Sequence, residues 1–180
     1  MGHSTGRSYT LLPQIIAGLM LITSSISWAK GQPIGQATAL WGGFIKIYDA
    51  TLYSPTAVNT QSLLADHTDL TLELCYHRSI DRKDIIKAAQ KALPEALPNP
   101  IEQAINALHD QYQSVQKGDC YTLSHTPEEG TQLTLNDTSL FKTQTPGFKS
   151  AYFSIWLGDY ALSETVKAQL LANIDSTSTQ

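Results

Sequence analysis

The stretch WGGFIKIYDATLYSP, Trp41–Pro55, decides the fold. It predicts a β-strand over Trp41–Tyr53, in which successive side chains point to opposite faces. One face holds Phe44, Lys46, Tyr48, Ala50 and Leu52, and the other holds Ile45, Ile47, Asp49, Thr51 and Tyr53. Both faces are largely apolar and carry one charge each, whereas a half-exposed strand has one clean polar face. We therefore expect helices to cover one face, and folded-over structure or a ligand to cover the other.

Further strands are predicted on both sides of this stretch. The short segment Ile34–Leu40 precedes it and is a candidate strand. Leu70–His77 alternates strictly, with leucines on one face and polar residues on the other. Three more strands are predicted over Cys120–His125, Gln132–Leu135 and Thr138–Lys142. The last two are joined by Asn136-Asp137, residue types that tolerate the left-handed backbone of a tight turn.

Two amphipathic helices are predicted between these groups of strands. In SIDRKDIIKAAQKAL, 79–93, apolar residues recur at helical spacing, with Ser79 or Asp81 as the N-cap and Pro94 after the end. In NPIEQAINALHDQY, 99–112, Asn99 is the expected cap and Pro100 takes the first helical position. Both helices have an apolar stripe that needs a common surface, and the predicted sheet provides it.

The end of the chain is helical again. One apolar helix follows Pro146 and ends at Gly158, and a shorter helix runs from Ser163 to about Ala172. Residues 173–180 are polar and are expected to be a disordered tail. Grouped runs of strands and helices predict an α+β domain in which helices cover an antiparallel sheet.

The first 29 residues differ from the rest and are expected to be a signal peptide. Arg7 is their only charged residue, and Ile15–Ile22 is an uninterrupted apolar run. Ser27 and Ala29 fit the small-residue pattern before a cleavage site, which predicts cleavage after Ala29 and a periplasmic or secreted protein. The run is shorter than the ~20 residues that span a bilayer. An uncleaved membrane anchor remains the alternative, and no stable span is expected after cleavage.

Charge and motifs exclude several classes of function. Without the leader the chain keeps 11 basic and 16 acidic residues, a net charge of −5, which argues against binding to nucleic acid or an anionic membrane surface. The chain has no GxSxG, HExxH, phosphate-loop or dinucleotide motif. Its histidines after the leader lie apart, without the spacing of metal ligands, at His67, His77, His109 and His125. No metal and no cofactor are predicted.

The two cysteines, Cys75 and Cys120, have two interpretations. An oxidising compartment allows a disulfide between them. Two buried free thiols are the alternative. The residues are far apart in the sequence and have no CxxC spacing, which argues against redox or metal chemistry.

Four residues are candidates for ligand contacts from the residue pattern alone. Tyr76 and Arg78 end one strand on the same face, where a phenol and a guanidinium together hold a carboxylate or an enolate. The alternative is that Arg78 extends into water. Lys46 and Tyr48 also share a face and are candidates to line a cleft between sheet and helices. Alternatively, Lys46 reaches the sheet edge and Tyr48 bonds a backbone carbonyl.

Several stretches together resemble a known family. GGFIKIYDATLYSP is similar to a strand of the chalcone isomerase superfamily, and GDCYTLSHTPEEGTQLTLND and FSIWLGD resemble its exported bacterial branch. The resemblance covers roughly Gly35–Leu171 and places a chalcone isomerase-like domain at 30–172. It implies an open-faced β-sandwich, in which a ligand cleft lies between a long antiparallel sheet and a layer of helices.

The resemblance also implies that the catalytic residues are missing. The position of the enzyme's charge-stabilising guanidinium falls at Gln36, and a neutral amide cannot supply its charge. The enzyme's threonine falls at Tyr48, and its tyrosine and asparagine have no counterpart near 80–82 and 87–90. Non-enzymatic plastid relatives hold a fatty-acid carboxylate with an arginine and a tyrosine. Tyr48 resembles that tyrosine, and Arg78 is a candidate to replace the arginine.

We therefore expect an exported, non-catalytic protein that binds a small apolar or amphipathic molecule, similar to a fatty acid, in the cleft. Two alternatives stay open. The first is an isomerase or lyase with a reworked active site. The second is a scaffold whose cleft is filled by its own side chains and which acts through a protein partner. A cavity of several hundred Å³ favours ligand binding or catalysis over the scaffold.

Overall fold

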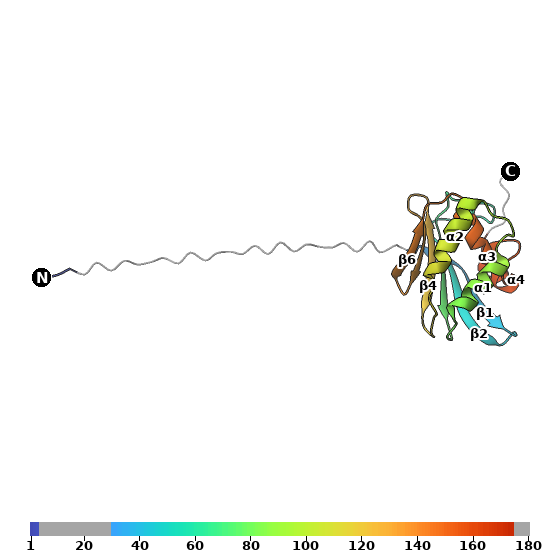
Figure 1. The fold of residues 1–180 in the computed structure, drawn as a ribbon, viewed down its shortest axis with the longest axis horizontal. Coiled ribbons are helices and arrows are strands. Elements are labelled where there is room, and N and C mark those ends of the chain that lie inside the picture. The colour runs from blue at the N-terminus through green and yellow to red at the C-terminus, as the bar shows by residue number, and fades with distance from the viewer. Residues whose placement is uncertain (4–29, 175–180) are drawn as a thin grey trace.

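The computed structural model describes residues 1–3 and 30–174 and is an α+β domain (Figure 1). Its six strands form one antiparallel sheet in chain order, and the four helices gather on one side of it. The strands are β1 Gln32–Trp41, β2 Ile45–Ser54, β3 Leu70–Tyr76, β4 Cys120–Thr126, β5 Gly130–Leu135 and β6 Thr138–Thr143. The helices are α1 Arg82–Ala92, α2 Asn99–Gln111, α3 Phe148–Leu157 and α4 Glu164–Leu171. The predicted open-faced β-sandwich is confirmed.

The structure describes little of the predicted leader and tail. The predicted signal peptide falls almost entirely outside the described residues. Of the predicted tail, 173–180, only Asn173 and Ile174 are described, and Ile174 is buried against the core. Within the described residues, no helix is both long enough and apolar enough to cross a membrane.

The inner face of the sheet is built by alternating leucines. The register aligns one leucine from each of four consecutive strands, and all of them are buried: Leu52, Leu72, Leu123 and Leu133. Burying a leucine side chain contributes roughly 1.5–3 kcal/mol. This row lies against the helices and forms the centre of the core.

The outer face of the sheet is polar, which corrects the expectation that both faces of the Trp41–Pro55 stretch are covered. The neighbouring row across β2 to β5 consists of Thr51, Glu73, Thr122 and Thr134. Glu73 accepts a hydrogen bond from the Tyr53 hydroxyl at 3.2 Å and pairs with Lys30. These polar contacts lie where we expected folded-over structure or a ligand.

The Trp41–Tyr53 stretch is not one strand, and this prediction was wrong. Trp41 ends β1, residues 42–44 form a turn, and β2 begins at Ile45. Gly42 and Gly43 have φ values of 62° and 82°, a left-handed backbone that glycine adopts without a steric penalty. The stretch is therefore a β-hairpin, with Phe44 exposed at its tip.

A β-bulge close to this turn changes which side chains face the helices. Ala39 pairs with Tyr48, but the next residue, Leu40, pairs with Lys46, so that Ile47 is the extra residue on β2. A bulge shifts the alternation of side chains by one position. Ile47 and Tyr48 consequently both face the helices, and Lys46 does not.

Helix ends agree with local sequence signals in most cases. Asp81, one of the two predicted caps of α1, accepts a hydrogen bond from the Lys83 backbone N–H at 2.9 Å. Ser163 caps α4 through the Val166 N–H at 3.3 Å. Pro98, not Asn99, is the N-cap residue of α2, one position earlier than expected.

One disulfide bond and one close backbone contact hold parts of the fold together. Cys75 and Cys120 are opposed in the β3–β4 register and form a disulfide bond. At the edge strand β1, α4 packs so closely that a Cβ atom at Gly35 would lie 1.8 Å from the Leu170 carbonyl oxygen. Only glycine allows this approach.

Candidate ligand-binding site

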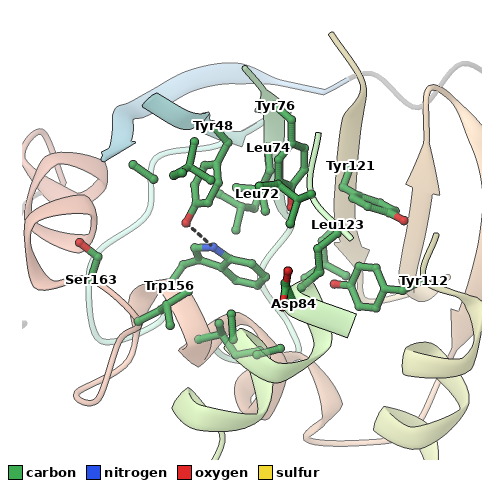
Figure 2. Close-up of a pocket in the computed structure, with 18 of the residues that line it drawn as sticks. Tyr48, Leu72, Leu74, Tyr76, Asp84, Tyr112, Tyr121, Leu123, Trp156 and Ser163 are labelled. Carbon is green, nitrogen blue, oxygen red and sulfur yellow. Dashed lines mark hydrogen bonds between the residues drawn. The ribbon is translucent and has the colours of Figure 1, made fainter. Parts of the chain in front are cut away.

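A cavity of about 410 Å³ lies between the sheet and the helices (Figure 2). The sheet contributes leucines, among them Leu72, Leu74 and Leu123, and α1 and α3 contribute Ile85 and Ile155. Leu40, Trp41 and Leu162 lie at the rim and are largely exposed. The bulge and the hairpin turn of β1 and β2 bring Trp41 and Ile47 to this rim.

Aromatic side chains make up much of the cavity wall. They are Trp41, Tyr48, Tyr76, Tyr112, Tyr121 and Trp156. Tyr76 packs edge to face against Tyr48 and Tyr121, with ring centroids 5.7 and 6.3 Å apart. These edge-to-face contacts fix the ring planes, because aromatic pairs favour this arrangement over face-to-face stacking.

Tyr48 is tied to the opposite wall of the cavity. The indole Nε1 of Trp156 donates a hydrogen bond to its hydroxyl oxygen at 3.3 Å, a contact drawn in Figure 2. Burial raises the pKa of Tyr48, and the hydrogen bond from Trp156 opposes this effect. The phenol stays protonated at neutral pH and keeps its own O–H available as a donor.

Unlike the hydroxyl of Tyr48, the hydroxyl of Tyr76 has no hydrogen-bond partner among the described residues. Only 6% of this residue is exposed, and it lines the cavity. Burial raises the pKa of Tyr76 well above its usual value, and the neighbouring tyrosines add to the shift. The only fully buried polar side-chain atom without a partner among the described residues is His109 Nε2, so the Tyr76 hydroxyl is open to the cavity, where a partner would enter.

Two further tyrosines are bonded within the protein. The Tyr121 hydroxyl donates to the Gln113 carbonyl at 2.9 Å and accepts from the Gln113 N–H at 2.8 Å. The Tyr112 hydroxyl accepts from Tyr152 at 3.0 Å, and burial raises the pKa of Tyr112. At neutral pH these phenols are hydrogen-bonding groups and not bases.

Asp84 is the only charged residue among the described residues that line the cavity. It lies in the first turn of α1, where the helix dipole favours a negative charge. Its carboxylate makes no hydrogen bond or ion pair with any described residue. Asp84 is exposed, so the described lining carries one negative charge where the cavity meets solvent and no cationic residue.

The structure brings together only two of the five predicted ligand contacts, Tyr48 and Tyr76. Gln36 and Lys46 line a separate shallow depression beside Asp49. Gln36 follows the alternation of β1 and points away from the core, whereas the bulge at Ile47 turns Lys46 away. The expectation that Lys46 lies beside Tyr48 on one face is wrong.

Arg78 is also absent from the described lining of the cavity. Strand β3 ends at Tyr76, and His77 and Arg78 form a bend in which strand alternation no longer applies. Arg78 is exposed. The expected pairing of its guanidinium with the Tyr76 phenol on one strand face is therefore not present.

Sequence reasoning missed most of the cavity wall, including Asp84, Tyr112 and Trp156. Tyr112 and Trp156 were recognised only as apolar positions of helices. Asp84 was indistinguishable from any acidic residue in the first turn of a helix. No local pattern identifies which of these side chains face the sheet, because that depends on how each helix is rotated against it.

The described residues offer no metal-binding cluster of three or more histidine, cysteine or acidic side chains. They also offer no guanidinium or ammonium group in the cavity lining. What remains is an apolar, aromatic chamber with a few hydroxyls and one carboxylate. Chemically, this arrangement can bind an apolar body and orient a polar end.

Comparison with known proteins places the fold. A family model described as chalcone isomerase-like matches residues 41–172. The structure is similar to that of a fatty-acid binding protein of Arabidopsis thaliana, with a TM-score of 0.62 and 9% sequence identity, over 82% of this chain and 89% of that one. A search of curated proteins found no match. Because the family model covers most of the described residues, the chain belongs to the chalcone isomerase-like family.

Proposed function

We propose that this protein is an exported, non-catalytic member of the bacterial branch of its family, which binds a small apolar or amphipathic molecule with a fatty-acid-like chain. The observation that carries the proposal is the apolar cavity of about 410 Å³ between sheet and helices. Pockets for small ligands span roughly 300–1,000 Å³ and are mostly apolar. A scaffold with a cleft filled by its own side chains would not keep this space.

Non-catalytic binding is favoured over the isomerase or lyase alternative by the charges of the cavity. Ring closure of a chalcone builds negative charge on oxygen, which a catalyst stabilises with positioned donors or cations. The described lining offers only Asp84 as a charged group, and Gln36 points away. The similar fold of a fatty-acid binding protein supports the same choice.

Filling the cavity tests the proposal. Ala88 lines the cavity on α1, so Ala88→Phe places a ring inside it, whereas Ala107→Phe adds the same ring on the exposed side of α2. In calorimetry with a series of linear alcohols, we expect the wild type and Ala107→Phe to bind with 1:1 stoichiometry, and Ala88→Phe to bind at least about tenfold more weakly. Absence of binding by the wild type, or equal binding by both variants, contradicts the proposal.

Turnover of a chalcone separates binding from catalysis. We expect ring closure at the spontaneous rate with or without the protein, followed by absorbance at several protein concentrations. A rate that rises in proportion to protein concentration and falls with Tyr48→Phe supports the isomerase alternative. Whichever result is obtained, native mass spectrometry of protein purified from its own host would identify the molecule that co-purifies.

Export is the remaining part of the proposal and rests on the leader sequence. Cleavage after Ala29 would give Lys30 as the mature N-terminus. Peptide mapping of the protein from periplasmic or culture fractions is expected to begin at Lys30. Recovery of an intact Met1 peptide from membranes would support the uncleaved anchor.

A further inference from the structure

The charges around the cavity do not suit a carboxylate ligand. Asp84 is the only charged residue in the described lining, and it is negative. A carboxylate drawn into the cavity would find no cation in this lining, although Arg82 acts on the wall residue Tyr121 by opposing the rise in the pKa of its phenol. Burying an unpaired charge is costly. The apolar chain of a fatty acid therefore suits this cavity better than its head group does.

Asp84 is a solvent-exposed residue at the edge of the cavity lining. It lies in the third position of α1, Arg82–Ala92, and its carboxylate has no hydrogen-bond or ion-pair partner among the described residues. Figure 2 shows this side chain on the α1 side of the cavity, between the rings of the wall. An ionised carboxylate accepts up to about four hydrogen bonds and attracts a cation.

Tyr76 is a second, independent indication of a polar ligand group. Its hydroxyl reaches the cavity from β3 and has no partner among the described residues, although only 6% of the residue is exposed. The oxygen is open to the cavity and available to a ligand group. A head group that donates hydrogen bonds would satisfy both the Tyr76 oxygen and the Asp84 carboxylate.

The aromatic wall favours a cation over a neutral donor. Tyr48, Tyr76 and Trp156 surround the same space from β2, β3 and α3. A cation within about 6 Å of an aromatic ring face is attracted by the electrons of the ring. Aromatic rings combined with one carboxylate form the kind of site that recognises ammonium groups.

From these contacts we propose that the ligand is a cationic amphiphile, with an ammonium head between Asp84 and Tyr76 and an apolar chain along the leucines of the sheet. This inference rests on the proposed function, since it specifies the ligand of the same cavity. Three probes with one chain and different heads test it: decylammonium, decanol and decanoate. Calorimetry at neutral pH and low salt, below the concentrations at which they aggregate, gives each affinity.

We expect the wild type to bind decylammonium about tenfold or more tightly than decanoate, with decanol in between. Asp84→Asn should weaken decylammonium binding about tenfold and leave decanol within about twofold. Glu102→Gln is the matched control, because Glu102 is an exposed acid near the start of α2 and does not line the cavity. It should leave all three affinities unchanged. Higher salt should reduce the advantage of decylammonium.

The outcomes separate the two proposals. Decanol binding with no preference for decylammonium over decanoate overturns the cationic ligand and leaves the proposed function intact. The same holds if Asp84→Asn and Glu102→Gln behave alike. Absence of binding by all three probes overturns both proposals.

Discussion

The indole Nε1 of Trp156 donates a hydrogen bond to the hydroxyl of Tyr48 at 3.3 Å and thereby joins α3 to β2 across a sequence separation of 108 residues. Both residues are buried, with 8% of each exposed. The bond spans the cavity wall from the helix layer to the sheet. It therefore links the width of the cavity to the packing of α3.

Tyr48→Phe should destabilise the protein by about 1 kcal/mol, because the buried Trp156 N–H loses its acceptor. Urea unfolding of wild type and variant measures this loss. Tyr160→Phe is the control, since 88% of Tyr160 is exposed, and it should change the free energy of unfolding by less than about 0.5 kcal/mol. Equal losses in the two variants would show that the bond to Trp156 contributes nothing.

The residue pattern predicted the sheet well wherever alternation is unbroken. Leu70–Tyr76 alternates along its whole length, and the inward placement of Leu72, Leu74 and Tyr76 follows directly. The prediction from alternation failed at Trp41–Ile47. A turn through two glycines and an extra residue at Ile47 both interrupt the period of two there. A bulge has no signature in residue composition, so Lys46 was placed on the wrong face.

The candidate site was predictable only in part for a related reason. Tyr48 and Tyr76 lie on strands, where the alternation of neighbouring leucines indicates the direction of each side chain. Trp156 and Asp84 lie on α3 and α1, and which of their sides meets the sheet depends on helix rotation. In α3 nearly every side is apolar and most of it is buried, so no stripe marked its inward face.

Gly35→Ala should displace α4 and destabilise the protein by about 3 kcal/mol, the upper part of the range for overpacking a core. The new Cβ would lie 1.8 Å from the Leu170 carbonyl oxygen, a backbone atom that cannot rotate away. Gly43→Ala is the comparison, because its φ of 82° strains alanine while no atom lies within 4 Å. It should cost about 1–2 kcal/mol. A smaller loss for Gly35→Ala than for Gly43→Ala would contradict close packing of α4 on β1.

Removing the disulfide should lower the free energy of unfolding by roughly 4 kcal/mol in the chain-entropy model, because Cys75 and Cys120 are separated by 45 residues. The double variant Cys75→Ala/Cys120→Ala, compared with the oxidised wild type in urea, measures it. Thiol counting on unfolded, unreduced wild type should find no reactive thiol. Two reactive thiols would show that the bridge does not form in the protein as isolated.

Lys149 should make the protein more stable as the pH rises from about 8 towards 10. It is fully buried in α3, and its Nζ donates to the carbonyl oxygens of Ala65 and Thr68 at 2.6 and 2.7 Å. Burial lowers the pKa of Lys149 from 10.5 to about 8, against the opposing effect of Asp66 and Asp69. Between these values the unfolded chain binds more protons than the folded one, so that the free energy of unfolding increases with pH.

The size of this rise is limited to about 3 kcal/mol, because each pH unit of pKa difference corresponds to about 1.4 kcal/mol. Above pH 10 the buried tyrosines act in the opposite direction. Burial raises the pKa of Tyr76 and Tyr152, so that the folded state keeps protons that the unfolded chain loses, and stability falls. The useful window for measurement is therefore about pH 7.5–9.5, where Lys149 dominates.

Urea unfolding at several pH values in this window tests the prediction on three proteins. Wild type should gain stability with pH, and Lys149→Met should lose that dependence because it has no proton to release. Lys149→Met also leaves the Ala65 and Thr68 carbonyls without their donor, which should cost about 1–3 kcal/mol at pH 9.5. Lys87→Met, at an exposed position of α1, should keep the wild-type slope. A flat profile for the wild type, or the same slope in Lys149→Met, would show that the folded-state pKa of Lys149 is close to that of the unfolded chain.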